Sequence, residues 1–125
     1  MQTIINTKNA PAPIGPYNQA TMAGNTLFMS GQIALNPETG ELIMDSIPNE
    51  THQVMKNLLA VLKEAKMDFS NVVKCSIFLS DMNNFPVVNE IYGSYFSGNY
   101  PARETVQVSI LPMGVNVEIS AIAVK

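Results

Sequence analysis

The segment PNETHQVMKNLLAVLKEAKMDFSNVVKCSIFL, residues 48–79, contains the two clearest elements of the chain. Its first part repeats apolar residues at the spacing of one α-helical face: Val54, Leu58, Val61, Leu62 and Ala65. Pro48 lies where the first turn would begin, and Met67–Asp68 would end the helix. The β-branched and apolar run over residues 71–79 then predicts a central strand.

The remaining sequence predicts one more helix and five short strands around this pair. The helix is expected at residues 85–96, and the strands at 3–5, 19–22, 27–32, 104–110 and 115–124. This order favours an α+β fold with one mixed sheet of about six strands and two helices on one face. No repeat or linker divides the chain, so residues 1–125 are expected to form a single domain.

The composition indicates self-association and argues against nucleic-acid binding. Hydrophobic residues make up 46% of the chain and charged residues 14%, well below the ~25% charged residues of an average soluble domain. The uncovered sheet face of so apolar a chain needs a partner, which favours an oligomer. The net charge is −3 and the seven cations are scattered. Because no basic face can be drawn from them, neither DNA nor RNA is expected as a partner.

Cysteine use and hydropathy predict a cytoplasmic protein. Cys75 is the only cysteine, so no intramolecular disulfide can form, which suits a reducing compartment. The first residues lack the basic and apolar runs of a signal peptide, and no run approaches the ~20 apolar residues that span a bilayer. We therefore expect no membrane association.

Several chemistries are disfavoured by the residue inventory. One histidine and one cysteine cannot form a zinc site of the usual type, so no metal is expected. No glycine-rich phosphate-binding motif signals a nucleotide cofactor, and no cofactor is expected. His52 is interpreted as a solvated helix residue rather than a catalytic base. Cys75, on one strand face with Val73, Ile77 and Leu79, is interpreted as a buried inert thiol.

Arg103 is a candidate anion-binding residue. It is the only arginine among seven cations, and it lies in Asn99-Tyr100-Pro101-Ala102-Arg103, where a stiffened loop enters a strand. A guanidinium binds a carboxylate through two parallel hydrogen bonds, which lysine cannot do. The alternative is an ordinary structural salt bridge.

Glu118 is a second candidate, in the predicted strand over residues 115–124. The alternation places Glu118 on the more polar strand face, where a carboxylate needs pairing or hydration. It could serve as a general base with a raised pKa. The alternative is an ion pair with Arg103 or a lysine.

A set of short segments distributed over nearly the whole chain resembles the reactive intermediate deaminase (Rid, or YjgF-like) family. The segments are Asn9-Ala10-Pro11, Ile14-Gly15-Pro16-Tyr17, Met29-Ser30-Gly31-Gln32-Ile33, Asn57, Val72-Val73-Lys74, Val88-Asn89-Glu90-Ile91-Tyr92, Phe96, Tyr100-Pro101-Ala102-Arg103, Val117-Glu118-Ile119 and Ala121-Ile122-Ala123-Val124. Each segment is weak evidence alone, but their joint order and spacing are specific. The resemblance implies a chorismate-mutase-like fold and a homotrimer with sites between subunits, so that Arg103 and Tyr17 would reach one site from different chains.

The resemblance also implies the reaction. It is hydrolysis of reactive 2-imino acids (2-iminobutanoate and 2-iminopropanoate), released by PLP-dependent dehydratases of threonine or serine, to 2-oxo acids and ammonia. Carried over to this chain, Arg103 binds the substrate carboxylate and Glu118 orients and deprotonates the attacking water. Backbone groups of Gly31 and Thr105 hold the carboxylate or the imine nitrogen, and Tyr17, Ser30 and Asn89 shape the pocket. Threonine at position 105, where many relatives carry cysteine, removes any thiol function there.

Two other functions remain open on the same scaffold. A regulatory protein could bind 2-oxo acids without turnover, although sensing a carboxylate would not need Glu118 nearby. A ribonuclease or translation-inhibitor activity is known for some relatives, but the acidic chain without a basic patch counts against it.

Overall fold

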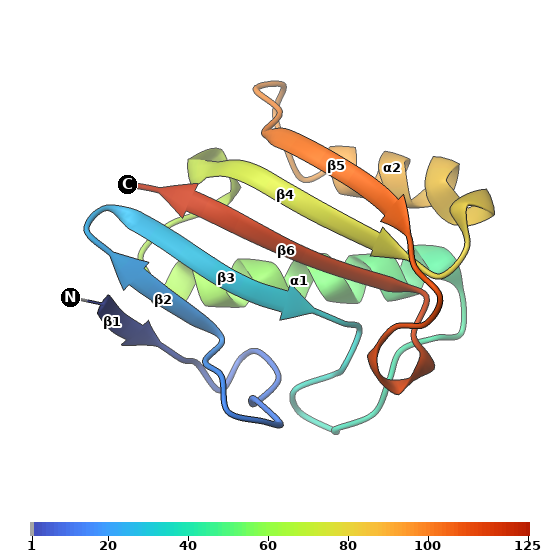
Figure 1. Ribbon diagram of the computed structural model, residues 1–125, viewed down its shortest axis with the longest axis horizontal. Coiled ribbons are helices and arrows are strands. Elements are labelled where there is room, and N and C mark those ends of the chain that lie inside the picture. Colours follow the sequence, from blue (N-terminus) through green and yellow to red (C-terminus); the bar gives the residue numbers. More distant parts are fainter. Residues whose placement is uncertain (1) are drawn as a thin grey trace.

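The computed structural model describes residues 2–125, which form one mixed six-stranded sheet with two helices on one face (Figure 1). The strands are β1 (Gln2–Ile5), β2 (Ala20–Ala23), β3 (Thr26–Gln32), β4 (Val72–Leu79), β5 (Ala102–Gln107) and β6 (Val117–Val124). Their order across the sheet is β1-β2-β3-β6-β4-β5. Among the described strands, only β4 and β5 pair in parallel. The helices α1 (Ile47–Glu64) and α2 (Phe85–Gly93) lie behind the sheet in the view of Figure 1. The α+β prediction is confirmed.

The core lies between α1 and the central strands. β6 alternates strictly, with Val117, Ile119, Ala121 and Ala123 buried toward the helices. β4 contributes Cys75, Ile77 and Leu79 to the same layer. The predicted face of α1 is confirmed, since all five residues of its apolar repeat are buried. Among the described residues, no helix is both long and apolar enough to cross a membrane.

Two helix ends differ from the prediction. α1 stops at Glu64, because Lys66 adopts a left-handed conformation (φ 60°) and the amide of Met67 bonds back to the carbonyl of Leu62. α2 stops at Gly93 rather than at Phe96. Beyond Gly93, the amides of Tyr95 and Phe96 donate to the carbonyls of Tyr92 and Gly93, three residues back, so the chain continues in turns rather than as an α-helix.

Two strand predictions are also corrected. β5 begins at Ala102, so Arg103 lies inside a strand and not in the loop that leads to it. Val73 does not share the buried face of Cys75, since a register shift between Val72 and Lys74 turns it outward.

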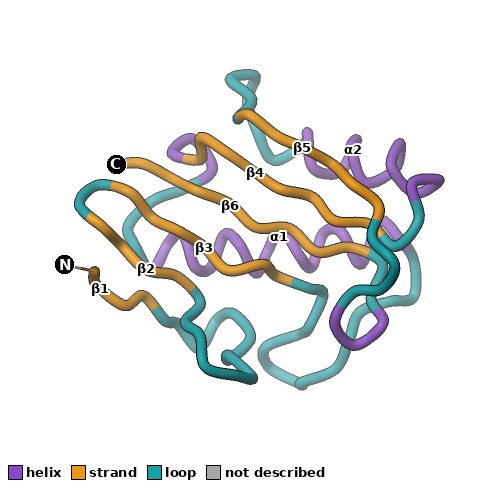
Figure 2. The backbone as a smooth tube through the Cα atoms, in the orientation of Figure 1, coloured by secondary structure: helices purple, strands orange, loops and turns teal. Residues whose placement is uncertain are grey.

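The remaining connections are short turns and two long loops. The hairpin turn between β2 and β3 contains Gly24 in a left-handed conformation (φ 58°). Short 3₁₀ turns lie at Phe69–Asn71, Met82–Asn84 and Pro112–Gly114. Figure 2 shows the loops over residues 6–19 and 33–46 at the lower edge of the sheet. Both loops line one surface cavity that includes Gln19 and Pro37.

A fully buried carboxylate fixes the start of β6. Glu50, in the first turns of α1, is 0% exposed and accepts hydrogen bonds from the backbone amides of Asn116 (2.8 Å) and Val117 (3.1 Å). The side-chain amide of Asn116 also donates to Glu50, at 2.8 Å. This arrangement ties α1 to the strand that carries Glu118.

Replacing Glu50 by alanine should lower the free energy of unfolding by about 3 kcal/mol or more, because one buried donor of Val117 and two partly buried donors of Asn116 lose their acceptor. Urea denaturation would measure this loss. Glu64→Ala, at an exposed site on the same helix, is the control and should change stability by less than ~0.5 kcal/mol. A loss below about 1 kcal/mol in Glu50→Ala would contradict an anchoring role.

Candidate functional site

Arg103 projects toward α2 from the edge strand β5. Its register partner on β4 is Cys75, which is buried on the helix side of the sheet, and neighbouring residues in register share a face. The Nη1 atom of Arg103 donates to Oδ1 of Asn89 on α2 at 2.7 Å. The guanidinium carbon lies over the rings of Phe85 (5.5 Å to the centroid) and Tyr92 (5.1 Å).

A cavity of about 590 Å³ opens beside this guanidinium. Its lining comes from α2, from the loop before β5 and from β5 itself: Asn89, Glu90, Tyr92, Gly93, Tyr100, Pro101 and Arg103. Within residues 2–125 the one ion pair joins Lys74 to Glu104, so Arg103 has no carboxylate partner. The structural salt bridge considered for Arg103 is absent from this part of the chain, and its remaining N–H groups can bind an anion.

Thr105 lies on the same side of β5 as Arg103. It pairs with Ile77, another buried residue of the helix-facing layer. Its hydroxyl is buried and has no hydrogen-bond partner among the described residues. Arg103, Asn89 and Thr105 thus form one group, which we call the arginine group.

Glu118 lies on the opposite face of the sheet. Its register partner on β4 is Phe78, which points away from the helices. Burial raises the pKa of the Glu118 carboxyl above its ordinary value of 4.5. The ion pair considered for it with Arg103 or a lysine is absent from the described part of the chain.

Gly31 allows the Glu118 carboxylate to approach β3. A β-carbon on Gly31 would lie 2.4 Å from Oε2 of Glu118, closer than any side chain tolerates. The neighbouring Ser30 donates its hydroxyl to the carbonyl of Asn18 at 2.6 Å, which fixes the loop that carries Tyr17. The side chain of Tyr17 is 48% exposed. Ser30, Gly31 and Glu118 form a second group, the glutamate group, whereas Tyr17 lies in the loop before β2.

A single chain does not bring the two groups together. β6, which carries Glu118, is separated from β5, which carries Arg103, by β4, and the two side chains point to opposite faces. Glu118 faces the side of the sheet opposite the helices, and Figure 1 shows that neither helix covers that side.

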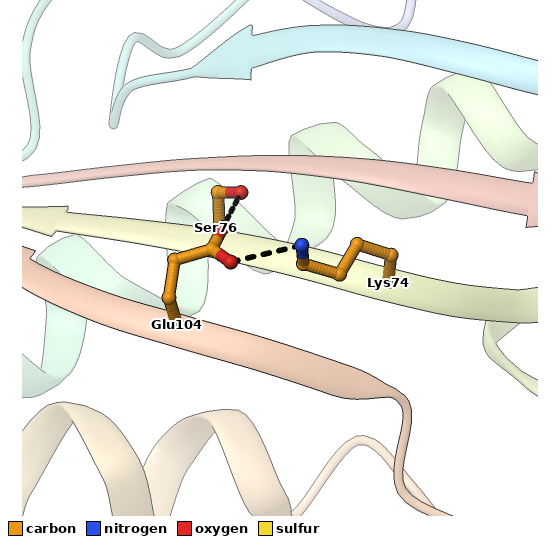
Figure 3. Close-up of polar contacts among 3 residues, drawn as sticks. All are labelled: Lys74, Ser76 and Glu104. Carbon is orange, nitrogen blue, oxygen red and sulfur yellow. Dashed lines mark hydrogen bonds and ion pairs between the residues drawn. The ribbon is translucent and has the colours of Figure 1, made fainter.

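That uncovered face is mixed in character. It exposes Phe28, opposite Ile122 in register, and Val106 of β5. Near the β5 edge of this face, Glu104 pairs with Lys74 at 2.8 Å and also accepts a hydrogen bond from Ser76 (Figure 3). The bonds from Lys74 and Ser76 lower the pKa of the Glu104 carboxyl, so it stays ionised on this face.

The remaining titratable candidates are built into the fold. Burial raises the pKa of the Cys75 thiol, so the interpretation of Cys75 as inert agrees with the structure. His52 is not simply solvated, since its Nδ1 lies 2.7 Å from the hydroxyl of Tyr95, and this contact links α1 to the segment after α2. Among residues 2–125, no three His, Cys, Asp or Glu side chains cluster closely enough to hold a metal ion.

Sequence reasoning missed Glu50, Phe85 and Tyr92 as residues that support these groups. Phe85 and Tyr92 lie seven residues apart on one face of α2, and nothing in their local sequence shows that a cation packs on them.

Comparison with known proteins assigns the family. The model of the family described as endoribonuclease L-PSP matches residues 7–125. A mouse protein named 2-iminobutanoate/2-iminopropanoate deaminase is 49% identical over 125 residues, which is 100% of this chain and 93% of the mouse protein. The solved structure of RidA from an Antarctic Psychrobacter has a TM-score of 0.95 at 40% identity, covering 98% of this chain and 99% of that one. Escherichia coli TdcF with bound serine has a TM-score of 0.94 at 37% identity, with 98% of each chain covered. This chain belongs to the Rid/YjgF family.

Proposed function

We propose that this protein hydrolyses 2-iminobutanoate and 2-iminopropanoate to the corresponding 2-oxo acids and ammonia. The observation that carries the proposal is a guanidinium without a carboxylate partner at the wall of a cavity. Relatives that match the full length of this chain bear the name of this activity in mouse, rat and human, at 49%, 47% and 44% identity. In this proposal Arg103 binds the substrate carboxylate through two hydrogen bonds.

In this proposal Glu118 acts as the general base. Its raised pKa keeps it basic enough to remove a proton from water, and the carbon of a protonated imine is a strong electrophile. Water adds to this carbon while one of its protons passes to Glu118, and Glu118 then returns that proton to the amino nitrogen. The C–N bond breaks as the hydroxyl oxygen forms the C=O bond of the 2-oxo acid, and the hydroxyl proton leaves with ammonia as ammonium. Backbone groups of Gly31 and Thr105 hold the carboxylate or the imine nitrogen, and Tyr17, Ser30 and Asn89 shape the pocket.

The complete site needs two copies of the chain. Arg103 and Glu118 face opposite sides of the sheet, so one copy supplies the arginine group and its neighbour supplies the glutamate group. We propose a homotrimer, in which the uncovered sheet faces with Phe28 and Val106 pack around a common centre. The lone buried Cys75 suits a cytoplasmic location.

A coupled assay tests the activity. A threonine dehydratase generates 2-iminobutanoate, and its disappearance is followed with and without the protein. Clear acceleration over the spontaneous rate supports the proposal. Binding of 2-oxobutanoate without any acceleration would instead indicate a sensor of 2-oxo acids.

Subunit mixing tests the shared site. Arg103→Ala and Glu118→Gln are each expected to be nearly inactive. Refolded together in equal amounts, they should recover about a quarter of wild-type activity, because random assembly pairs an intact Arg103 with an intact Glu118 at one site in four. No recovery, or a monomer by light scattering, would contradict a site between subunits.

Gly31→Ala should reduce kcat about 10-fold, since the added methyl group forces the Glu118 carboxylate away from its position. Steady-state kinetics on 2-iminobutanoate would measure this. The same substitution in the Glu118→Gln background is the control, where it should cost much less if it acts through the carboxylate. Equal losses in both backgrounds would show that Gly31 serves another purpose.

A further inference from the structure

The face of α2 toward β5 is built around Arg103. Phe85, Asn89 and Tyr92 stand at i, i+4 and i+7, so they share one side of the helix. Asn89 accepts one hydrogen bond from the guanidinium, and the two rings lie 5.5 and 5.1 Å from its central carbon. All three partners are electrically neutral.

Neutral partners can orient an anion-binding arginine without competing with the anion. An acidic partner would orient the guanidinium, but it would also occupy the in-plane N–H donors and compete with the substrate. An aromatic ring attracts the cation through its π face and uses none of those donors. Glu90 lines the same cavity, yet in the described chain it forms no ion pair with Arg103.

Tyr92, the nearer of the two rings, is itself uncharged and contacts an uncharged group. Tyr92 is 2% exposed, and its hydroxyl lies against the thiol of Cys75. Burial raises the pKa of both groups, so both are neutral at pH 7. The tyrosine therefore contributes a fixed ring face and no negative charge.

We propose that Phe85 and Tyr92 form an aromatic clamp that positions Arg103, holding its guanidinium while leaving the remaining N–H groups free for a substrate carboxylate. This inference rests on the proposed function, since it assigns the clamp to the same carboxylate site. Phe85 and Tyr92 are positioning residues, because they act through Arg103. Their loss should weaken carboxylate binding and raise KM, while kcat changes by less than about twofold.

The test is a binding titration with 2-oxobutanoate, a carboxylate that is not turned over. Phe85 is replaced by phenylalanine analogues with increasing numbers of ring fluorines, which keep the shape of the ring but weaken its attraction for a cation. The Kd should rise with each step, to about 5- to 30-fold for the most fluorinated ring. The same replacements at Phe69, a core residue that packs on Tyr95 and not on Arg103, are the control.

Conventional variants give an independent measurement. Tyr92→Leu should raise the Kd by a similar factor, and Tyr92→Phe, which restores a ring, should recover most of the lost affinity. An unchanged Kd along the fluorine series overturns the clamp. If Arg103→Ala nevertheless abolishes binding, the proposed carboxylate site survives, whereas unchanged binding in Arg103→Ala overturns that site as well.

Discussion

Arg103→Ala is expected to reduce kcat/KM for 2-iminobutanoate about 100-fold or more, through the loss of two hydrogen bonds to a charged carboxylate. The fold should survive the change, because the Arg103 side chain is exposed and, within residues 2–125, its one side-chain hydrogen bond is to Asn89. Steady-state kinetics in the coupled assay, together with thermal unfolding of the variant, would measure both effects.

Arg103→Lys distinguishes the effect of the positive charge from the effect of the guanidinium geometry. Lysine keeps the positive charge but lacks the planar fork of donors, so kcat/KM should still fall about 10-fold or more. Lys63→Gln removes an exposed cation from α1, far in the sequence from the arginine group, and should leave the rate unchanged. Activity within about twofold of wild type in Arg103→Ala would exclude Arg103 as the carboxylate-binding residue.

The elements in which apolar residues repeat regularly over a long segment could be predicted from the sequence. The repeat from Val54 to Ala65 fixed the buried face of α1, and strict alternation fixed both faces of β6. In these segments burial and local periodicity agree, since each residue lies on a regular helix or strand. The placement of Glu118 on the sheet face opposite the core followed from the same alternation.

The structure differs from the sequence-based predictions where contacts between residues distant in sequence determine it. A one-residue irregularity in pairing with β6 turns Val73 outward, and no local pattern marks it. Glu50 resembles a solvated helix-start residue until β6 places Asn116 against it, 66 positions away. The separation of Arg103 from Glu118 depends on strand order, with β4 between the two strands, and strand order is a property of the whole sheet.

Glu118→Gln is expected to reduce kcat about 100-fold or more, because the general base is lost while the shape of the side chain is kept. In the wild type, kcat/KM should fall as the pH is lowered through the pKa of Glu118, which burial places above 4.5. The glutamine variant should lack this acidic limb. Rates corrected for spontaneous hydrolysis, measured across the pH range, would show the difference, and an unchanged profile would contradict the role of base.

The same substitution should raise the stability of the protein, although it lowers the activity. Since its pKa is raised in the folded state, Glu118 binds a proton more tightly there than in the unfolded chain. The free energy of unfolding therefore declines as pH rises from 4.5 through the raised pKa, and the ionised carboxylate destabilises the fold at pH 7. Glu118→Gln should increase the free energy of unfolding at pH 7, measured by denaturation at one fixed protein concentration. A residue kept for structure would lose stability on substitution, so a variant that is more stable and less active identifies Glu118 as a group retained for catalysis.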